Sequence, residues 1–345
     1  MKKLSILLVL ALLLALFAGC QDQTPASNTA PETVKPSTSP RPSQSNAAPE
    51  PSDAPVVDPD AVHPMLFHVT GENGQEMYLF GTIHVGDART KTALEKLKPF
   101  LDGCGALAVE FDVVAFEKDT AAQTKAMTQF VLTDGTTVDA YMPAELFEQS
   151  SALLEEAGLM PGLMKFYNLS MWSQLVEQAA LLTKCSLDMN AGMDRSLINY
   201  CYEKQIPVRD VESAEFQYGL LAGFSDELNL LMIENTLKNL GDYGTQVDAL
   251  YAAWVEGNYE HILAVIEEED SDETEELTEE QKKLVEAYND AMLTQRNLGM
   301  RDKAVQWLRA GDKVFFAVGA AHLVGEGGLV ELLRSAGYSV EQLSY

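Results

Sequence analysis

Short strand-like runs and one helical segment begin the folded part of the chain. Residues 65–70 and 76–81 favour β structure on either side of Gly71-Glu72-Asn73-Gly74, which is typical of a hairpin. Residues 89–102 place apolar side chains at helical spacing, and glycines follow directly. A buried strand is expected next, over 106–112, with two carboxylates at its end.

The remaining hydrophobic pattern is mostly helical. Apolar residues recur every three or four positions in the middle of the chain, over 144–157, 162–183 and 194–204. Further helices are expected within 213–240 and 246–266, along the amphipathic stretch 278–309, and at 326–335. The strands expected in this part are 205–212, 313–318 and 338–343.

This order of elements predicts a mixed α/β fold. A central mixed sheet would be built from the N- and C-terminal strands, with a large helical region in the middle of the chain. The strand–helix–strand order over 76–112 suggests a crossover unit, which puts His84 and Glu110 at the carboxyl ends of strands. Sites in open α/β sheets usually form at that edge.

The N-terminal residues have the layout of an exported lipoprotein. Residues 1–20 begin with two lysines, continue with an apolar run and end in Gly19-Cys20, which resembles a lipobox with Cys20 as the lipidated residue. The alternative is an ordinary signal peptide with an incidental cysteine, and either one implies export. Residues 21–60 contain nine prolines and no aromatic residue, so 21–62 is expected to be a disordered tether. Residues 63–345 would then form one domain on the outer face of the membrane.

Charge and cysteine content exclude several classes. A formal net charge of −28 argues against nucleic acid and against an anionic membrane surface as partners. Ten acidic residues fall within 267–280, a run that is typical of a solvated loop or a helix start rather than a calcium loop. The cysteines after residue 20 are Cys104, Cys185 and Cys201, without zinc spacing; Cys185 and Cys201 pair, or all are free thiols.

Two of the five histidines follow strands in the same sequence frame. They are the last residues of Gly81-Thr82-Ile83-His84 and Gly319-Ala320-Ala321-His322. Two imidazoles and a carboxylate commonly hold a divalent transition metal and leave positions open for water and substrate. His84, His322 and Glu110 suit that role, and a metal would allow hydrolysis without a serine or cysteine nucleophile. The alternative for each histidine is a structural residue at a strand end.

These motifs resemble the TraB/GumN family, which includes the Tiki proteases. The resemblance covers nearly all of 63–345 and depends on the order of several further pieces: Val109-Glu110, Gly192-Met193-Asp194, Val211-Glu212-Ser213 with Gln217, Trp254 with Gly257-Asn258, and Arg296-Asn297. It implies a mixed α/β domain with both GxxH histidines and a glutamate at the active site. Manganese or cobalt dependence is associated with the Tiki branch, and zinc is a further candidate.

The resemblance assigns roles residue by residue. It implies that His84 and His322 are metal ligands and that Glu110 is a ligand or the general base, between which the spacing does not choose. Arg296 would stabilise an oxyanion or hold a substrate carboxylate, and its alternative is a surface position on a helix.

Three more acidic residues are supporting candidates. Asp194 would act beside the metal or substrate, or cap the helix that begins after Gly192. Glu212 would orient a histidine, although we favour a salt bridge at the strand end. Asp112, two residues after Glu110, is expected on the same side of an extended strand as a reserve ligand.

The leading functional hypothesis is a lipid-anchored, extracytoplasmic metal-dependent hydrolase, a peptidase that acts on peptides or protein N-termini. An ester-cleaving enzyme on the same scaffold is a second possibility, because no feature separates amide from ester substrates. A non-catalytic lipoprotein that sequesters peptides is a third. A solute-binding lipoprotein of a transporter would share the anchor but would not explain the histidine pair.

Overall fold

The structure is a computed structural model that describes residues 58–267 and 277–345. The expected signal peptide, Cys20 and most of the expected tether lie outside the described residues, as does 268–276 of the acidic run. Residues 58–62, the end of the expected tether, include the short 3₁₀ helix η3 (Pro59–Ala61) and the buried side chain of Val62. In the part of the chain described, no helix is both long and apolar enough to span a bilayer.

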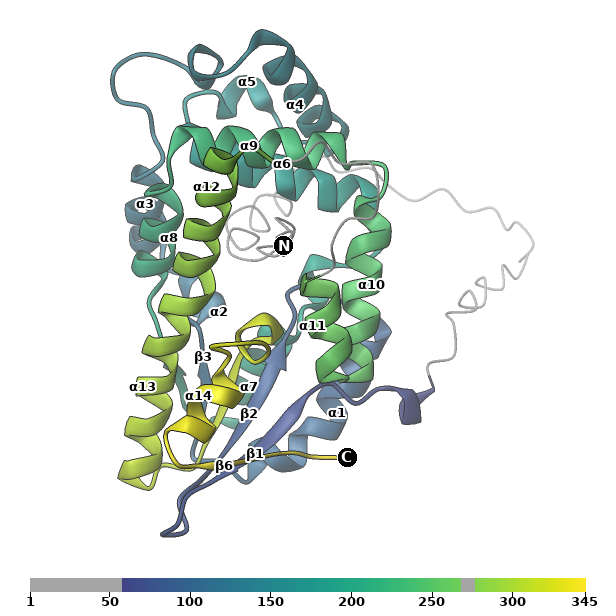
Figure 1. The fold of residues 1–345 in the computed structure, drawn as a ribbon, viewed down its shortest axis with the longest axis vertical. Coiled ribbons are helices and arrows are strands. Elements are labelled where there is room, and N and C mark those ends of the chain that lie inside the picture. Colours follow the sequence, from purple (N-terminus) through teal and green to yellow (C-terminus); the bar gives the residue numbers. More distant parts are fainter. Residues whose placement is uncertain (1–57, 268–276) are drawn as a thin grey trace, which may run out of the picture.

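A six-stranded mixed sheet forms the centre of the fold, as predicted (Figure 1). Its strands are β1 (Leu66–Thr70), β2 (Glu76–Thr82), β3 (Ala106–Val109), β4 (Val208–Asp210), β5 (Val314–Gly319) and β6 (Ser339–Gln342), in the spatial order β4-β3-β5-β2-β1-β6. β1 and β2 form the predicted hairpin, and β1 also pairs antiparallel with β6. β2, β5, β3 and β4 run parallel.

Insertion of β5 between β2 and β3 brings the two ends of the domain together. Thr82 at the end of β2 pairs with Gly319 at the end of β5, and Val109 at the end of β3 pairs with Ala317. Residues 314–318 are all buried, as expected for a central parallel strand that is covered on both faces. The carboxyl ends of β2, β3 and β5 therefore meet at one edge of the sheet.

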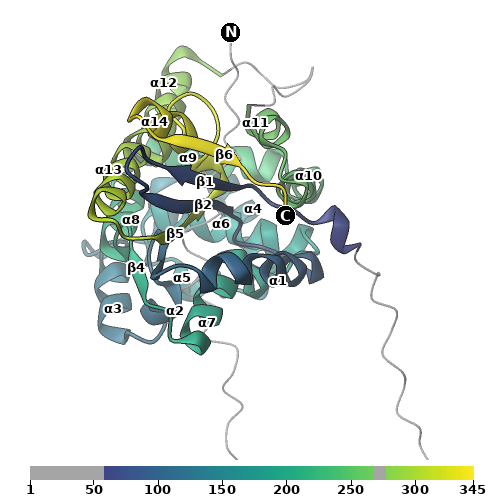
Figure 2. The same cartoon turned by 90° about the horizontal axis from the view of Figure 1, so that it is seen from below.

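Helices cover both faces and one end of the sheet. In the described residues they are α1 (Ala88–Asp102), α2 (Val113–Phe116), α3 (Thr120–Thr128), α4 (Ala144–Glu156), α5 (Pro161–Met164), α6 (Leu169–Lys184), α7 (Met193–Lys204), α8 (Ala214–Ala222), α9 (Asp226–Lys238), α10 (Tyr243–Glu256), α11 (Tyr259–Glu267), α12 (Glu279–Asn289), α13 (Gln295–Ala310) and α14 (Leu329–Ser335). Viewed from below, the sheet separates α14 from α1 and α7 (Figure 2).

Alternate side chains of each strand enter two different cores. Phe80 and Phe315 point into the core that α1 and α7 complete, whereas Leu79 and Phe316 point into the core under α13 and α14. This alternation follows from the two-residue period of a strand. Both faces of β2 and β5 are buried, so the ends of these strands are held in fixed positions.

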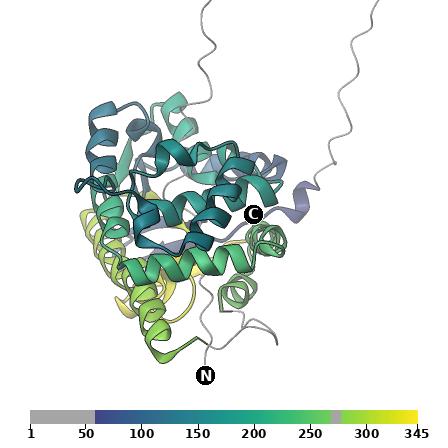
Figure 3. The ribbon, with the colours of Figure 1, turned by 90° about the horizontal axis from the view of Figure 1, so that it is seen from above.

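The helical middle region lies at the end of the molecule opposite the β1–β2 hairpin (Figures 1 and 3). There α6 packs against α4 and α9, and Trp172 donates from Nε1 to Ser150 Oγ at 2.9 Å. The prediction of helical spacing through 162–183 missed a break, because this segment forms α5 and α6 with residues 165–168 between them. Asn168 caps α6 by accepting a hydrogen bond from the Met171 N–H, which gives the second helix its own start.

The amphipathic stretch 278–309 forms one long helical run with a π-helical segment inside it. Thr278 begins α12 with a capping box, so this end of the acidic run is a helix start. Residues Asp290–Thr294 form the π-helical segment η6, which α13 follows directly. π-helical segments inside α-helices are frequent at functional sites.

All three cysteines of the described residues are free thiols. Cys201 is buried in α7, and Cys104 and Cys185 are half-buried. The pairing of Cys185 with Cys201 is therefore not formed, and the free-thiol alternative applies.

Candidate active site

His84 stands in a tightly held loop two residues after β2. The Met193 N–H donates to Ile83 O at 2.8 Å, and Trp254 Nε1 donates to Gly81 O at 2.8 Å. Gly192 packs directly on the backbone of His84, where a Cβ on Gly192 would lie 2.4 Å from the His84 carbonyl oxygen. The start of α7 thus fixes the position of the histidine.

Replacing Gly192 with alanine is expected to displace His84 and to destabilise the fold by about 1–3 kcal/mol, the usual cost of overpacking. The cause is the 2.4 Å approach, which backbone atoms alone must relieve. Urea unfolding of the variant and of Gly162→Ala, whose added Cβ meets nothing within 4 Å, provides the test. Equal stabilities of the two variants would contradict this packing argument.

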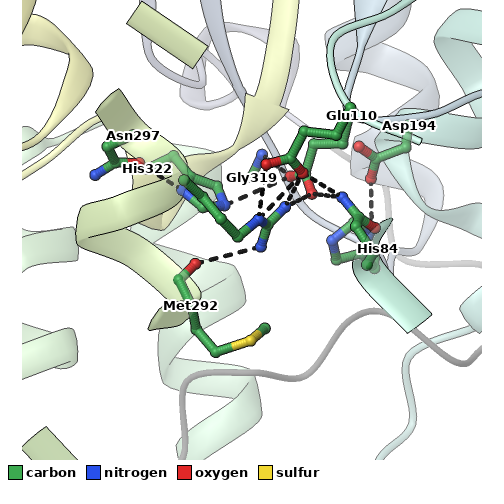
Figure 4. A network of polar contacts seen from close by, with 10 residues as sticks. His84, Glu110, Asp194, Met292, Asn297, Gly319 and His322 are labelled. Carbon is green, nitrogen blue, oxygen red and sulfur yellow. Dashed lines mark hydrogen bonds and ion pairs between the residues drawn. The ribbon is translucent and has the colours of Figure 1, made fainter. Parts of the chain in front are cut away.

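Asp194 is the partner of His84. Its Oδ2 lies 2.8 Å from His84 Nδ1 (Figure 4). Burial lowers the pKa of His84, but the neighbouring Asp194 carboxylate more than offsets this, so the pKa is raised. The alternative of an N-cap was wrong, because Gly192 occupies the N-cap of α7 and Asp194 lies in the first turn.

Glu110 lies just beyond β3 and is held by three donors. Its Oε2 accepts hydrogen bonds from Arg296 Nη2 at 2.6 Å and from Gln217 Nε2 at 3.0 Å. Its Oε1 accepts from the backbone N–H of Gly319 at 2.9 Å, which ties β3 to the end of β5. Burial raises the pKa of Glu110, but the nearby Arg296 guanidinium more than offsets this. The pKa therefore lies well below its usual range, and the carboxylate is ionised.

Arg296 is a buried ion-pair partner of two carboxylates. It is 4% exposed, so the alternative of a surface position was wrong. Its Nη2 lies 2.8 Å from Glu212 Oε2, and its Nε donates to both oxygens of Glu212 at 3.1 Å. Glu212 thus forms the salt bridge that we favoured and makes its closest contacts with Arg296 and Gln217 rather than with a histidine.

His322 lies in the short helix η7 (Ala320–His322) directly after β5. Its Nδ1 is 2.6 Å from Asn297 Oδ1, and its Nε2 is 3.8 Å from Glu110 Oε1. Burial and the Arg296 charge lower the pKa of His322 to about 3, so the ring is neutral. The sheet edge therefore gathers Glu110 and His322 directly, with His84 close enough to influence the pKa of both.

Comparison with known proteins identifies the family of the chain. The sequence profile of the TraB/PrgY/gumN family matches residues 65–342. The chain belongs to this family. An uncharacterized protein YbaP from Escherichia coli (strain K12) is 26% identical over 269 residues, which cover 77% of this chain and 90% of YbaP. The YbaP of Shigella flexneri matches to the same extent, and no solved structure matches the chain.

Within this TraB/PrgY/gumN fold, Asp112 lies away from the site. The strand ends at Val109, and Asp112 caps α2 by accepting a hydrogen bond from the Ala115 N–H at 2.8 Å. Its other carboxylate oxygen contacts the hydroxyl of Tyr202. The expectation of a shared side with Glu110 failed because the chain turns before residue 112.

Two polar residues of the site had no role assigned from the sequence. Gln217 donates to Glu110 and, at 2.7 Å, to Glu212, and it is 1% exposed. Asn297 is 4% exposed and contacts His322. The sequence offered one indication for Asn297: it follows Arg296 within a helical pattern. Two adjacent polar residues on a buried helix face need polar partners.

His84, His322 and Glu110 have the nitrogen and oxygen donor atoms that divalent transition metals bind. As it stands, the described part of the chain holds no group of three or more His, Cys, Asp or Glu side chains arranged to bind a metal. Two donors are nevertheless close, because His322 Nε2 and Glu110 Oε1 are 3.8 Å apart, which bonds of ~2.0–2.2 Å to one ion can span. The third, His84, is the most exposed of the three, with 25% of its side chain accessible.

Proposed function

We propose that this protein is a metal-dependent hydrolase at the cell surface, a peptidase that acts on peptides or protein N-termini. The proposal depends mainly on the similar polar partners of the two histidine rings. Nδ1 of His84 faces Asp194, and Nδ1 of His322 faces Asn297, at 2.8 and 2.6 Å. Each ring is left with Nε2 as its open position, which is the arrangement that metal-binding histidines usually have.

The contact between His322 and Glu110 supports a cation at this place. A neutral imidazole with its proton on Nδ1 has a lone pair on Nε2, and the ionised Glu110 is an acceptor only. These two electron-pair donors face each other at 3.8 Å in a buried site. A positive ion between them would remove the repulsion.

His84, His322 and Glu110 would hold the ion, for which Mn²⁺, Co²⁺ and Zn²⁺ are the candidates. Such an ion supplies a water of lowered pKa and a Lewis acid for a scissile carbonyl. Glu110 is better suited to be a ligand than the general base, because three hydrogen bonds already occupy most of its lone pairs. The remaining acceptor position on Oε1 lies toward His322.

Arg296 has a supporting role in this proposal. An arginine has five N–H donors, and contacts to Glu110, to Glu212 and to the Met292 carbonyl engage Nε, Nη1 and Nη2. It therefore holds the two carboxylates and neutralises part of their charge, rather than binding an oxyanion. This role replaces the oxyanion-stabilising or substrate-binding role that the family resemblance implied.

Substrate would approach from the His84 side of the site. The side chains of His84 and Asp194 are 25% and 16% exposed, whereas His322 is 5% exposed. The proposed location, with Cys20 as a lipid anchor on the extracytoplasmic face, rests on the N-terminal sequence layout. The negative charge of the chain favours substrates other than nucleic acids.

The proposal is tested by hydrolysis of a peptide library by the metal-stripped protein after addition of Mn²⁺, Co²⁺ or Zn²⁺. Cleavage should return with at least one of these ions and should fall by about 100-fold or more in His84→Ala and His322→Ala, in line with losses on removing one transition-state-stabilising group. His63→Ala is the matched control, since His63 is exposed and should leave cleavage unchanged.

The outcomes separate the alternatives. Cleavage that persists in both histidine variants would overturn the metal site. Retained peptide affinity without cleavage under any metal would favour a sequestering protein, and hydrolysis of esters alone would favour the ester-cleaving enzyme.

A further inference from the structure

Asn297 contacts two different parts of the site through its two amide atoms. Its Nδ2 donates to the backbone carbonyl of Gly327 at 3.0 Å, and its Oδ1 lies 2.6 Å from His322 Nδ1. The side chain is buried at 4% exposure. It therefore links the helix α13 to η7 and to the glycine-containing loop that follows.

The carbonyl of Gly327 decides which way the amide points. A carbonyl oxygen only accepts hydrogen bonds, so the atom of Asn297 that faces it must be the NH₂ group. A flipped amide would place Oδ1 against Gly327 O, so that two acceptors face each other without a proton between them and the buried Oδ1 loses its donor, at a cost of about 1–3 kcal/mol. The oxygen of Asn297 must then be the atom that faces His322.

The orientation of Asn297 in turn decides the tautomer of His322. Because Oδ1 is an acceptor, Nδ1 of His322 must carry the proton, and the lone pair is then on Nε2. Nε2 is the atom that lies 3.8 Å from Glu110 Oε1.

We infer that Asn297 is a positioning residue that fixes His322 in its Nδ1–H tautomer and keeps Nε2 open toward Glu110. The assignment of the tautomer follows from the hydrogen bonds alone. Its consequence for metal binding rests on the proposed function.

The π-helical segment η6 directly precedes the start of α13, where Arg296 and Asn297 lie. In η6 the Gln295 N–H donates to Asp290 O, five residues back, so the helix gains a residue relative to α-helical register. The Met292 carbonyl in this segment accepts a hydrogen bond from Arg296 Nη1 at 3.3 Å. With this register, two adjacent residues of α13 reach two partners, Glu110 and His322.

The test measures the tautomer directly in the metal-free full-length chain. Ring ¹⁵N chemical shifts of histidine distinguish a protonated from an unprotonated nitrogen, and they should show His322 with its proton on Nδ1. Asn297→Ala should lose this preference. Asn297→Asp should keep the proton on Nδ1, since one aspartate oxygen still accepts from it, but its other oxygen then faces the Gly327 carbonyl, so this variant should be less stable. His84, which Asp194 supports, should keep its shifts in both variants and serves as an internal reference.

Metal affinity gives the second readout, by titration of the same proteins with Co²⁺. Asn297→Ala should bind Co²⁺ about 10–100-fold more weakly, the usual effect of removing a group that supports a metal-bound histidine, and Asn297→Asp should recover most of the affinity. Asn239→Ala makes the same chemical change at the C-cap of α9 and should bind like the unchanged chain.

Each result bears on a separate claim. An unchanged His322 tautomer in Asn297→Ala, or a proton on Nε2 in the unchanged chain, would overturn the inference. If Asn297→Ala does not fold, Asn297→Asp still decides, because loss of the tautomer in that variant contradicts the assigned role. If the His322 tautomer behaves as expected but neither the unchanged chain nor any variant binds Co²⁺, the proposed function is rejected. The inference about Asn297 then still holds.

Discussion

Replacing Arg296 with methionine is expected to destabilise the fold by about 3–5 kcal/mol, the range for breaking a buried ion pair by removing one partner. Arg296 is 4% exposed and is shared by Glu110 and Glu212, which are both largely buried. Without the guanidinium the two carboxylates would be buried without a counter-charge, and Gln217 would be the side-chain donor that they share. Chemical unfolding at neutral pH measures the loss.

Two further variants make this prediction specific. Arg301→Met removes an arginine that pairs with the exposed Asp302 and should cost less than about 1 kcal/mol, as surface pairs do. Adding Glu110→Gln and Glu212→Gln to Arg296→Met should recover part of the lost stability, because the uncompensated charges are removed. A free energy of unfolding for Arg296→Met close to that of Arg301→Met would contradict the account of the buried pair.

The second large effect is expected for Glu110→Gln, in peptide cleavage and in acid stability. Cleavage should fall by about 100-fold or more, since a glutamine lacks the charge that would hold the metal and balance Arg296. The pKa of Glu110 is lower in the folded chain than its ordinary value of 4.5. Its ionised form therefore adds stability above about pH 4.5, and this contribution is lost as the pH falls toward the folded pKa.

Acid unfolding of the variants tests the direction of this pH dependence. Glu110→Gln should lose less stability than the unchanged chain between neutral pH and acid pH. Glu177→Gln is a control of opposite sign, because burial raises the pKa of Glu177 despite hydrogen bonds from Tyr243 and Thr236. Protonation of Glu177 favours the folded state. Glu177→Gln removes this contribution, so the free energy of unfolding should fall more steeply toward acid pH than in the unchanged chain. The same pH dependence in both variants would contradict the opposite directions of the two pKa shifts.

The sequence predicted the elements of the fold well because their signals are local. The hairpin of β1 and β2, the helix α1 and the apolar strand β5 each follow from periodicity and turn residues within a short window. The matched frames around His84 and His322 also predicted that the two ends of the domain meet. Their pairing through β2 and β5 confirms that expectation for the backbone.

The partners within the site could not be predicted in the same way. Whether Asp194 caps a helix depends on where the helix begins to within two residues. In the structure Gly192 is the N-cap, and the Asp194 carboxylate contacts His84. Glu212 and Arg296 are far apart in sequence, so only the packing of α13 beside the sheet brings them together. The turn after Val109 is set by the cap of α2, which an alternating pattern does not reveal.

The most direct test of the central claim is the stoichiometry of Co²⁺ binding to the metal-stripped full-length chain. Visible absorption of the bound ion and calorimetry should show one ion per chain in the unchanged protein and in His63→Ala. The double variant His84→Ala/His322→Ala should bind none at this site. Absence of stoichiometric binding to the unchanged chain, or equal binding by the double variant, would contradict the proposal that the two histidines and Glu110 form a metal site.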